Sequence, residues 1–216
     1  MTGSTSPAAV GNDGEPATAR RADARLNRER LLTAAREVFA ESGPDASLNE
    51  VARRAGVGPG TLYRHFPNRQ ALVAAVIRER VDILCAHAAR LAVSDGGPTG
   101  GSGPEREAAN AALAEWLTAF VAHARLNQGL GAAAMDAHDA QFGAECHRRI
   151  ADAAGSVLAR AQREGTARAD VTVDDLVRLV VGVALSPAQS ADAAADEAQT
   201  ARLLALVLDG VHADGR

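Results

Sequence analysis

Apolar residues recur at intervals of three and four between Arg69 and Leu91, and this period constrains the fold more than any other feature of the chain. The apolar positions are Leu72, Val73, Val76, Ile77, Val81, Leu84 and Leu91. A period near 3.6 residues indicates a long amphipathic helix. Only 3% of the residues are aromatic whereas 47% are hydrophobic, so the core must consist mostly of Ala, Leu and Val. Because Ala and Leu favour helices and strand patterns are lacking, the sequence predicts an all-α fold.

Turn residues and apolar periods divide the rest of the chain into further segments. Residues 1–19 are small, polar and interrupted by Pro and Gly, which predicts a disordered tail. The sequence SDGGPTGGSGP at 94–104 predicts a flexible connector. The expected helices are 23–42, 48–55, 59–66, 69–91, 105–126, 129–140, 142–164, 173–186 and 196–212.

Charge is distributed unevenly along the chain. Residues 20–80 hold 12 Arg and 7 Asp or Glu, a net charge of +5, whereas residues 81–216 hold 11 Arg and 18 Asp or Glu, a net charge of −7. A basic front and an acidic rear fit a nucleic-acid-binding domain joined to a body with another task. Random variation of surface charge is the alternative explanation.

Two cysteines and the absence of targeting signals bear on the compartment. Cys85 and Cys146 fit no spaced disulfide framework, so free thiols in a reducing compartment are the simplest account. No window holds about 18 uninterrupted apolar residues, which predicts no membrane span. The first 19 residues lack both the basic start and the apolar stretch of a secretory signal. The sequence therefore predicts a cytoplasmic protein.

The stretch GVGPGTLYRHF at 56–66 allows two interpretations, a phosphate-binding loop or a DNA-reading turn. A dinucleotide-binding loop needs G-x-G-x-x-G after a strand, and a P-loop needs Gly-Lys-Ser/Thr. Here a helix comes first, the glycine spacing differs, and the chain has no Lys. The phosphate-binding loop is therefore rejected.

Two short helices joined by a glycine-containing turn form a helix-turn-helix. Ser47 and Glu50 are spaced for a capping box that begins the first of them. Gly56 suits its end, because the left-handed backbone there disfavours residues with a Cβ. Pro59 suits the first position of the second helix.

The spacing of the second short helix also predicts which of its sides is buried. Leu62 and Phe66 lie four residues apart and are expected to face the core. The residues left pointing outward are Pro59, Gly60, Thr61, Tyr63 and Arg64. A helix with Pro and Gly at its tip can approach base edges in a major groove. The alternative is a helical hairpin whose Tyr and His merely pack.

The sequence GVGPGTLYRHFPNRQAL strongly resembles the DNA-binding head of the tetracycline-repressor (TetR) family of bacterial transcription regulators. The positions that match the family pattern are Thr61, Leu62, Tyr63, His65, Phe66, Asn68, Arg69 and Leu72. The resemblance covers about residues 25–80, and beyond them only the architecture agrees. It implies a DNA-binding domain over 20–68 and a helical effector-binding and dimerisation domain over 69–216.

The resemblance implies double-stranded DNA as the partner and assigns roles to single positions. Residues implied to contact the sugar-phosphate backbone are Ser47, Thr61, Tyr63, His65 and Arg69. Residues implied to lie where related proteins read bases are Asn49, Pro59, Gly60 and Arg64, the last of which is also a candidate phosphate contact. Arg20, Arg21 and Arg25 lie before or at the start of the first expected helix, either as an arm near the minor groove or as a solvated tail.

The rear of the chain is expected to pair and to sense a ligand. Two segments are apolar on almost every side, VDDLVRLVVGVAL at 173–185 and ARLLALVL at 201–208. They lie in the expected helices 173–186 and 196–212, which predicts a homodimer interface through these helices, or else two core helices of a monomer. Trp116, Phe120 and His123 share a helical face. The resemblance implies a small-molecule effector site here, made of these three with Met135, His138, Phe142 and Cys146; the alternative is ordinary core packing.

A single function fits these expectations best. It is a dimeric repressor that binds palindromic operator DNA and that a bound effector releases from the DNA. The helix from Arg69 is expected to couple effector binding to DNA binding. No metal or cofactor is expected, because His138, Cys146 and His147 lack compact zinc spacing. No catalytic constellation emerges, although triads assemble in space and a helical enzyme stays an alternative. A ligand-independent architectural DNA-binding protein is the third possibility.

Overall fold

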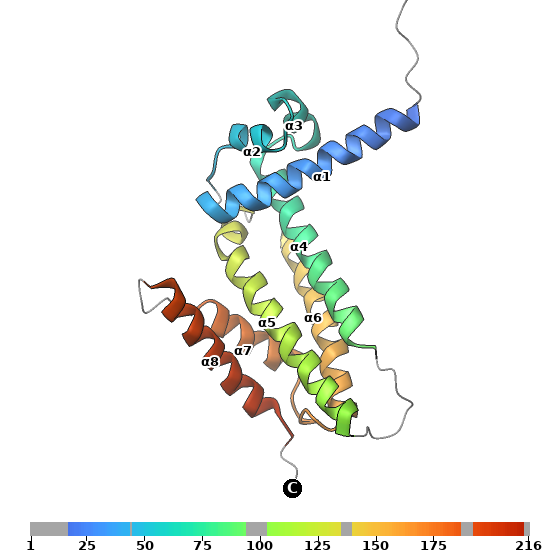
Figure 1. The fold of residues 1–216 in the computed structure, drawn as a ribbon, viewed down its shortest axis with the longest axis vertical. Coiled ribbons are helices and arrows are strands. Elements are labelled where there is room, and N and C mark those ends of the chain that lie inside the picture. Colours follow the sequence, from blue (N-terminus) through green and yellow to red (C-terminus); the bar gives the residue numbers. More distant parts are fainter. Residues whose placement is uncertain (1–16, 44, 94–102, 135–139, 187–191, 214–216) are drawn as a thin grey trace, which may run out of the picture.

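The computed structural model describes residues 17–43, 45–93, 103–134, 140–186 and 192–213 and folds them into helices (Figure 1). The helices are α1 (Ala17–Ser42), α2 (Leu48–Arg54), α3 (Pro59–His65), α4 (Arg69–Leu91), α5 (Gly103–Ala134), α6 (Ala140–Arg163), α7 (Val173–Ala184) and α8 (Ala193–Val211). The only β feature in these ranges is an isolated bridge between Ala167 and His212. The predicted all-α fold is confirmed.

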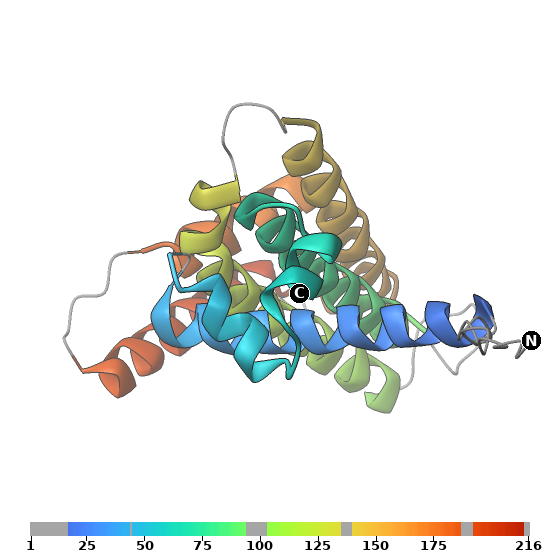
Figure 2. The same ribbon diagram turned by 90° about the horizontal axis from the view of Figure 1, so that it is seen from above.

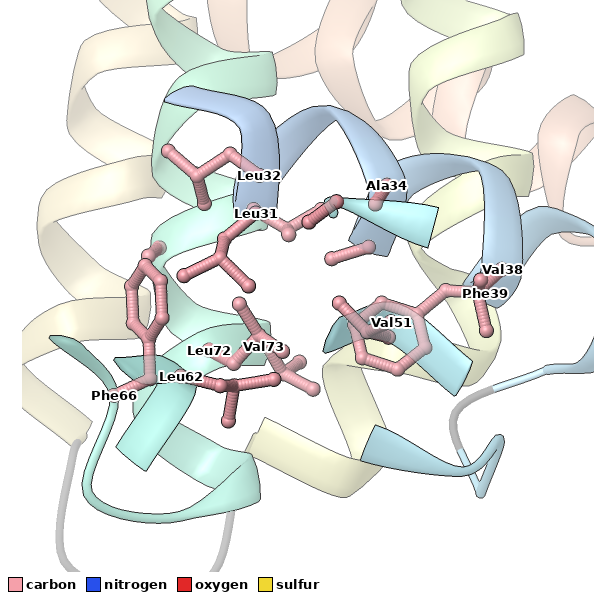
Figure 3. Close-up of a cluster of buried hydrophobic side chains, with 14 of the residues drawn as sticks. Leu31, Leu32, Ala34, Val38, Phe39, Val51, Leu62, Phe66, Leu72 and Val73 are labelled. Atoms are coloured by element: carbon pink, nitrogen blue, oxygen red, sulfur yellow. The ribbon is translucent and has the colours of Figure 1, made fainter. Parts of the chain in front are cut away.

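Helices α1, α2 and α3 form a head at one end of the molecule, and α4 closes its core from below (Figures 1 and 3). The side chains that fill this head core include Leu31, Val38, Phe39, Val51, Leu62, Phe66, Leu72, Val73 and Val76. All four helices contribute because each presents apolar residues at helical spacing to the same point. The head core fixes the position of α3 against α1 and α4.

Helices α4 to α8 form the body, in which α4, α5 and α6 run lengthwise and α7 and α8 pack beside α5 (Figure 1). A second hydrophobic cluster, the body core, includes Leu84, Leu113, Trp116, Leu117, Phe120, Val157, Leu158, Leu176, Val180 and Leu204. Helix α4 supplies residues to both cores, and Cys85 packs against both. The head and the body are therefore joined through one continuous helix.

Two boundaries differ from those expected. Helix α1 begins at Ala17, so residues 17–19 are helical, and Arg20 and Arg21 lie within this helix together with Arg25 instead of preceding it. No strong helix breaker stands between residues 17 and 23, and the Ala- and Arg-rich sequence favours extension. The rest of the predicted tail, residues 1–16, lies outside the described residues.

Helix α5 runs unbroken from Gly103 to Ala134, so the prediction of two helices over 105–126 and 129–140 is wrong. The chain stays helical across residues 127–129, because one glycine inside a helix, here Gly129, costs only about 1 kcal/mol. Of the predicted connector, residues 94–102 lie outside the described part, and 103–104 begin α5. None of the described helices combines the length and apolarity needed to cross a bilayer.

Candidate nucleic-acid interface

The turn between α2 and α3 depends on Gly56, whose φ of +68° lies in the left-handed region. Its N–H donates to the carbonyl of Arg53 at 3.2 Å, and the N–H of Val57 donates to that of Ala52 at 3.0 Å. This pair of bonds satisfies the carbonyls that the end of α2 would otherwise leave unpaired. Pro59 then starts α3 as predicted. The sequence therefore gives the helix-turn-helix its tight connection.

Helix α3 buries one side and exposes the other, as its spacing predicts. Figure 3 shows Leu62 and Phe66 within the head core. Leu62 and Phe66 are only 1% and 3% exposed, whereas Tyr63 is 49% exposed. Pro59, Gly60 and Arg64 are exposed as well, and Thr61 and His65 are half-buried. A hydroxyl, a phenol ring and a guanidinium are thus presented on one face at the free end of the head.

The capping box predicted at the start of α2 is absent. Ser47 is the N-cap residue, but its side chain makes no capping hydrogen bond. The carboxylate of Glu50 instead accepts from the guanidinium groups of Arg53, at 2.7 and 2.8 Å, and Arg54, at 2.8 Å. Charge-assisted bonds are stronger than a bond to a neutral amide, so Glu50 turns toward the arginines. Ser47 and Asn49 are left exposed.

An ion-pair network fastens α2 to α1. The guanidinium of Arg54 donates to Glu50 and also to the carboxylate of Glu41 on α1, at 2.5 and 2.7 Å. Hydrogen bonds from Arg53 and Arg54 lower the pKa of Glu50 to about 2, and the bond from Arg54 lowers the pKa of Glu41. Both carboxylates are therefore charged at neutral pH, and they balance much of the positive charge of α2.

Arg69 has a structural contact that the sequence does not reveal. Its guanidinium is half-buried and donates at 2.6 Å to the carbonyl of Ala46, in the loop before α2. The preceding Asn68 caps α4, because its side-chain oxygen accepts from the N–H of Ala71 at 2.8 Å. The start of α4 thus braces the start of α2. Contact of Arg69 with a phosphate stays a prediction.

The predicted effector residues fall into two groups. Trp116 and Phe120 are buried in the body core with ring centroids 5.3 Å apart, and the indole N–H of Trp116 donates to the carbonyl of Leu84 on α4. Phe142 and Cys146 on α6 instead pack against the head core. Met135 and His138 lie outside the described residues. The structure therefore does not bring the described members into one cluster.

His123 belongs to a polar chain between α4 and α5. The guanidinium of Arg80 donates to the side-chain oxygen of Asn127 at 3.0 Å, so the amide NH₂ of Asn127 faces His123, 2.9 Å from Nε2. A guanidinium only donates, which fixes this direction. Burial, followed by the charge of Arg80, lowers the pKa of His123 to about 4. The ring is therefore neutral. The four-residue spacing between His123 and Asn127 is the sequence feature that could have indicated this contact.

The described residues contain no group of three or more His, Cys, Asp or Glu side chains placed to hold a metal ion. Cys85 and Cys146 are free thiols. Burial raises the pKa of both thiols, which disfavours the reactive thiolate.

Comparisons with known proteins agree with this geometry. Residues 31–76 match the sequence profile of bacterial regulatory proteins of the tetR family, and residues 108–213 match that of the C-terminal domain of SbtR-like transcriptional regulators. The first of these segments contains the turn and α3, and the second contains most of the body. The two profiles therefore account for separate parts of the fold.

Solved structures resemble most of the chain. A TetR transcriptional regulator from Streptomyces coelicolor is 32% identical with a TM-score of 0.69, over 87% of this chain and 99% of that one. A TetR regulatory protein from Mycobacterium vanbaalenii is 33% identical with a TM-score of 0.65, over 89% and 99%. An HTH-type transcriptional regulator from Staphylococcus aureus is 41% identical over 68 residues, which span only 37% of its length and 31% of this chain.

Proposed function

Since this chain belongs to the TetR family of bacterial transcriptional regulators, we propose that it represses transcription by binding palindromic operator DNA as a homodimer. We further propose that a small molecule bound in the body releases it from DNA. The observation that carries the proposal is the exposed face of α3, held outward by Leu62 and Phe66. The protein needs no catalysis for this role, and it acts in the cytoplasm, where the operator lies.

In the proposed complex α3 enters the major groove. Pro59 and Gly60 form its tip, where small side chains let the backbone approach base edges, and Arg64 is placed to reach a base or a neighbouring phosphate. The hydroxyls of Ser47, Thr61 and Tyr63 then bond phosphates on either side. Asn49 lies on the exposed side of α2 and reads the groove edge. His65 supports the backbone contacts.

The proposed dimer forms through α7 and α8. Leu176 and Val180 of α7 are buried in the body core, whereas Leu179 on α7 and Leu206 on α8 are 50% and 67% exposed. They line a groove of about 720 Å³ between the two helices, whose rim includes Arg178. Apolar side chains in such a groove favour a second copy of the same surface, related by a twofold axis.

The proposed effector response passes through α4. An effector that contacts α5 near Phe120 and His123 acts on the helix that packs against α4. Since α4 belongs to both cores, a change in its tilt moves α3 and alters the distance between the two heads. By thermodynamic linkage, the effector then weakens DNA binding by the factor by which DNA weakens effector binding.

Selection of bound sequences from a random DNA pool tests this function. We expect the full-length protein to enrich a palindrome whose half-sites lie about one helical turn apart or more. Enrichment of a sequence without symmetry would contradict the dimeric mode of reading. Equal retention of all sequences with a steep salt dependence would instead identify a non-selective architectural protein.

A further inference from the structure

The first half of α1, residues 17–30, lies outside the head core, and we call it the basic arm. The first buried residue of α1 is Leu31. From Thr18 to Arg30, every described side chain is exposed except that of Asn27, which is half-buried. The match to the tetR-family profile also begins at residue 31. The basic arm therefore lies before the profile match and contributes little to the packing of the head core.

The basic arm carries a stripe of positive charge on one side. It contains 5 Arg and 2 acidic residues, a net charge of +3. Spacings of four and three place Arg21, Arg25 and Arg28 on the same face of the helix. Within this stripe Arg25 pairs with Glu29 at 3.2 Å, but the Arg25 side chain is 83% exposed. Such an exposed pair is weak and exchanges readily for a stronger anion.

The stripe lies on the side of α1 that adjoins α3. The guanidinium of Arg28 lies 5.3 Å from the ring centre of Phe66, the residue that caps the end of α3. Arg21 and Arg25 continue the same face away from the head core. The basic arm projects from the body (Figures 1 and 2), and its free end rises toward the level of α3 (Figure 1). The stripe and the exposed face of α3 thus belong to the same end of the molecule.

We propose that the basic arm binds the phosphate backbone of the duplex beyond the half-site that α3 reads, with Arg21 and Arg25 as the phosphate contacts. This inference rests on the proposed DNA-binding function. A helix of 14 residues is about 21 Å long, which corresponds to about six base pairs of duplex. Guanidinium groups bind phosphates through paired hydrogen bonds. Such contacts add affinity and position without reading sequence.

The double variant Arg21→Gln/Arg25→Gln tests the basic arm in the full-length protein. Its dissociation constant would be measured between 50 and about 300 mM salt on the selected operator, with and without ten flanking base pairs on each side. Two phosphate contacts per protomer, or four per dimer, predict a slope of log K against log salt that is shallower by about 3 to 4. Removing the flanks from the DNA should make the slope of the wild-type protein shallower by a similar amount.

The matched control is Arg90→Gln/Arg163→Gln, which removes the same charge from exposed positions at the far ends of α4 and α6. It should keep the wild-type slope. The inference is overturned if the arm variant has the same salt slope as the wild type, or if the control variant loses as much slope as the arm variant. Selective binding by α3 is unaffected by either outcome. A wild-type protein without selective binding overturns the proposed function and this inference with it.

Discussion

Leu62 and Tyr63 are neighbours in sequence, yet their side chains leave α3 on opposite sides, one 1% and the other 49% exposed. The sequence predicts this because Leu62 and Phe66, four residues apart, can both face the core only in one orientation of the helix. Local spacing is therefore enough to place the outward residues of the candidate site. What each of them contacts on DNA stays a prediction.

Replacing Tyr63 with Ala should weaken binding to operator and unrelated DNA to a similar degree. A hydrogen bond to phosphate contributes about 1 kcal/mol, so two copies in a dimer predict a roughly thirty-fold loss. Gel shifts on the selected operator and on a scrambled duplex measure both affinities. Tyr63→Phe keeps the ring and loses only the hydroxyl, so it should reproduce most of the loss. Unchanged binding by both variants would remove Tyr63 from the interface.

The polar chain from Arg80 to His123 could not be predicted from local spacing. It joins residues 43 positions apart, and its direction depends on a guanidinium that has only donors. In the sequence, His123 shares a helical face with Trp116 and Phe120, and for that reason it is a candidate ligand contact. The structure gives it a hydrogen-bonded, half-buried place between α4 and α5.

His123 should make the protein less stable in mild acid. Burial lowers its pKa from 6.5 to about 4, so between these values the unfolded chain binds a proton that the folded protein excludes. The free energy of unfolding therefore falls as the pH drops through this window, by about 2 kcal/mol at pH 5, and is fully retained above pH 6.5. Urea unfolding at pH 7.5 and pH 5 measures the loss. In His123→Gln, whose amide also accepts from Asn127, the loss should be smaller by that amount; equal losses would contradict the assignment.

Helix boundaries were predicted best where the sequence supplies a strong stop. Gly56 and Pro59 mark the end of α2 and the start of α3 because each has a backbone preference that other residues lack. The break expected between residues 126 and 129 is absent, because one unfavourable position, Gly129, does not end a helix. The capping box at Ser47 failed because two arginines compete for Glu50. The structure places one between Thr172 and Asp175.

Gly56→Ala should destabilise the head. A side chain at a φ of +68° is strained whatever the space around it, which predicts a loss of about 1–2 kcal/mol. Gly60→Ala is the matched control, because Gly60 lies inside α3 and an added Cβ meets nothing within 4 Å. This control should be neutral or up to about 1 kcal/mol more stable. Urea midpoints compare the two; equal stability would show that the turn tolerates a side chain.

Dimerisation of the protein should depend on the apolar face of α7 and α8. Leu206→Glu places a charge at the centre of the proposed interface and should turn the dimer into a monomer, because an unpaired charge there would be desolvated. Ile83→Glu is the control, since Ile83 on α4 is 54% exposed and lies outside the groove. Light scattering at micromolar concentration gives the mass of each. A monomeric wild type, or a Leu206→Glu dimer, would contradict the proposed interface.

At the scale of the whole chain, charge and apolar pattern predicted a basic front and a helical body, but not how the two are joined. The division between residues 68 and 69 stays a prediction. The head core continues past it along α4 to Val81 and takes in Phe142 from α6. Contacts between residues this distant in sequence have no local signature, so only the folded chain reveals them.

This shared core restricts how the protein can be recombined. A chimaera that joins the DNA-binding head to the body of another regulator must include α4 at least to Val81. Without this part of α4, the head core that contains Leu62 and Phe66 loses part of its packing. It must also supply a substitute for Phe142, whose ring packs under the guanidinium of Arg78. Exchange of DNA-binding specificity between such regulators is therefore constrained by the packing between head and body as much as by the surface that contacts DNA.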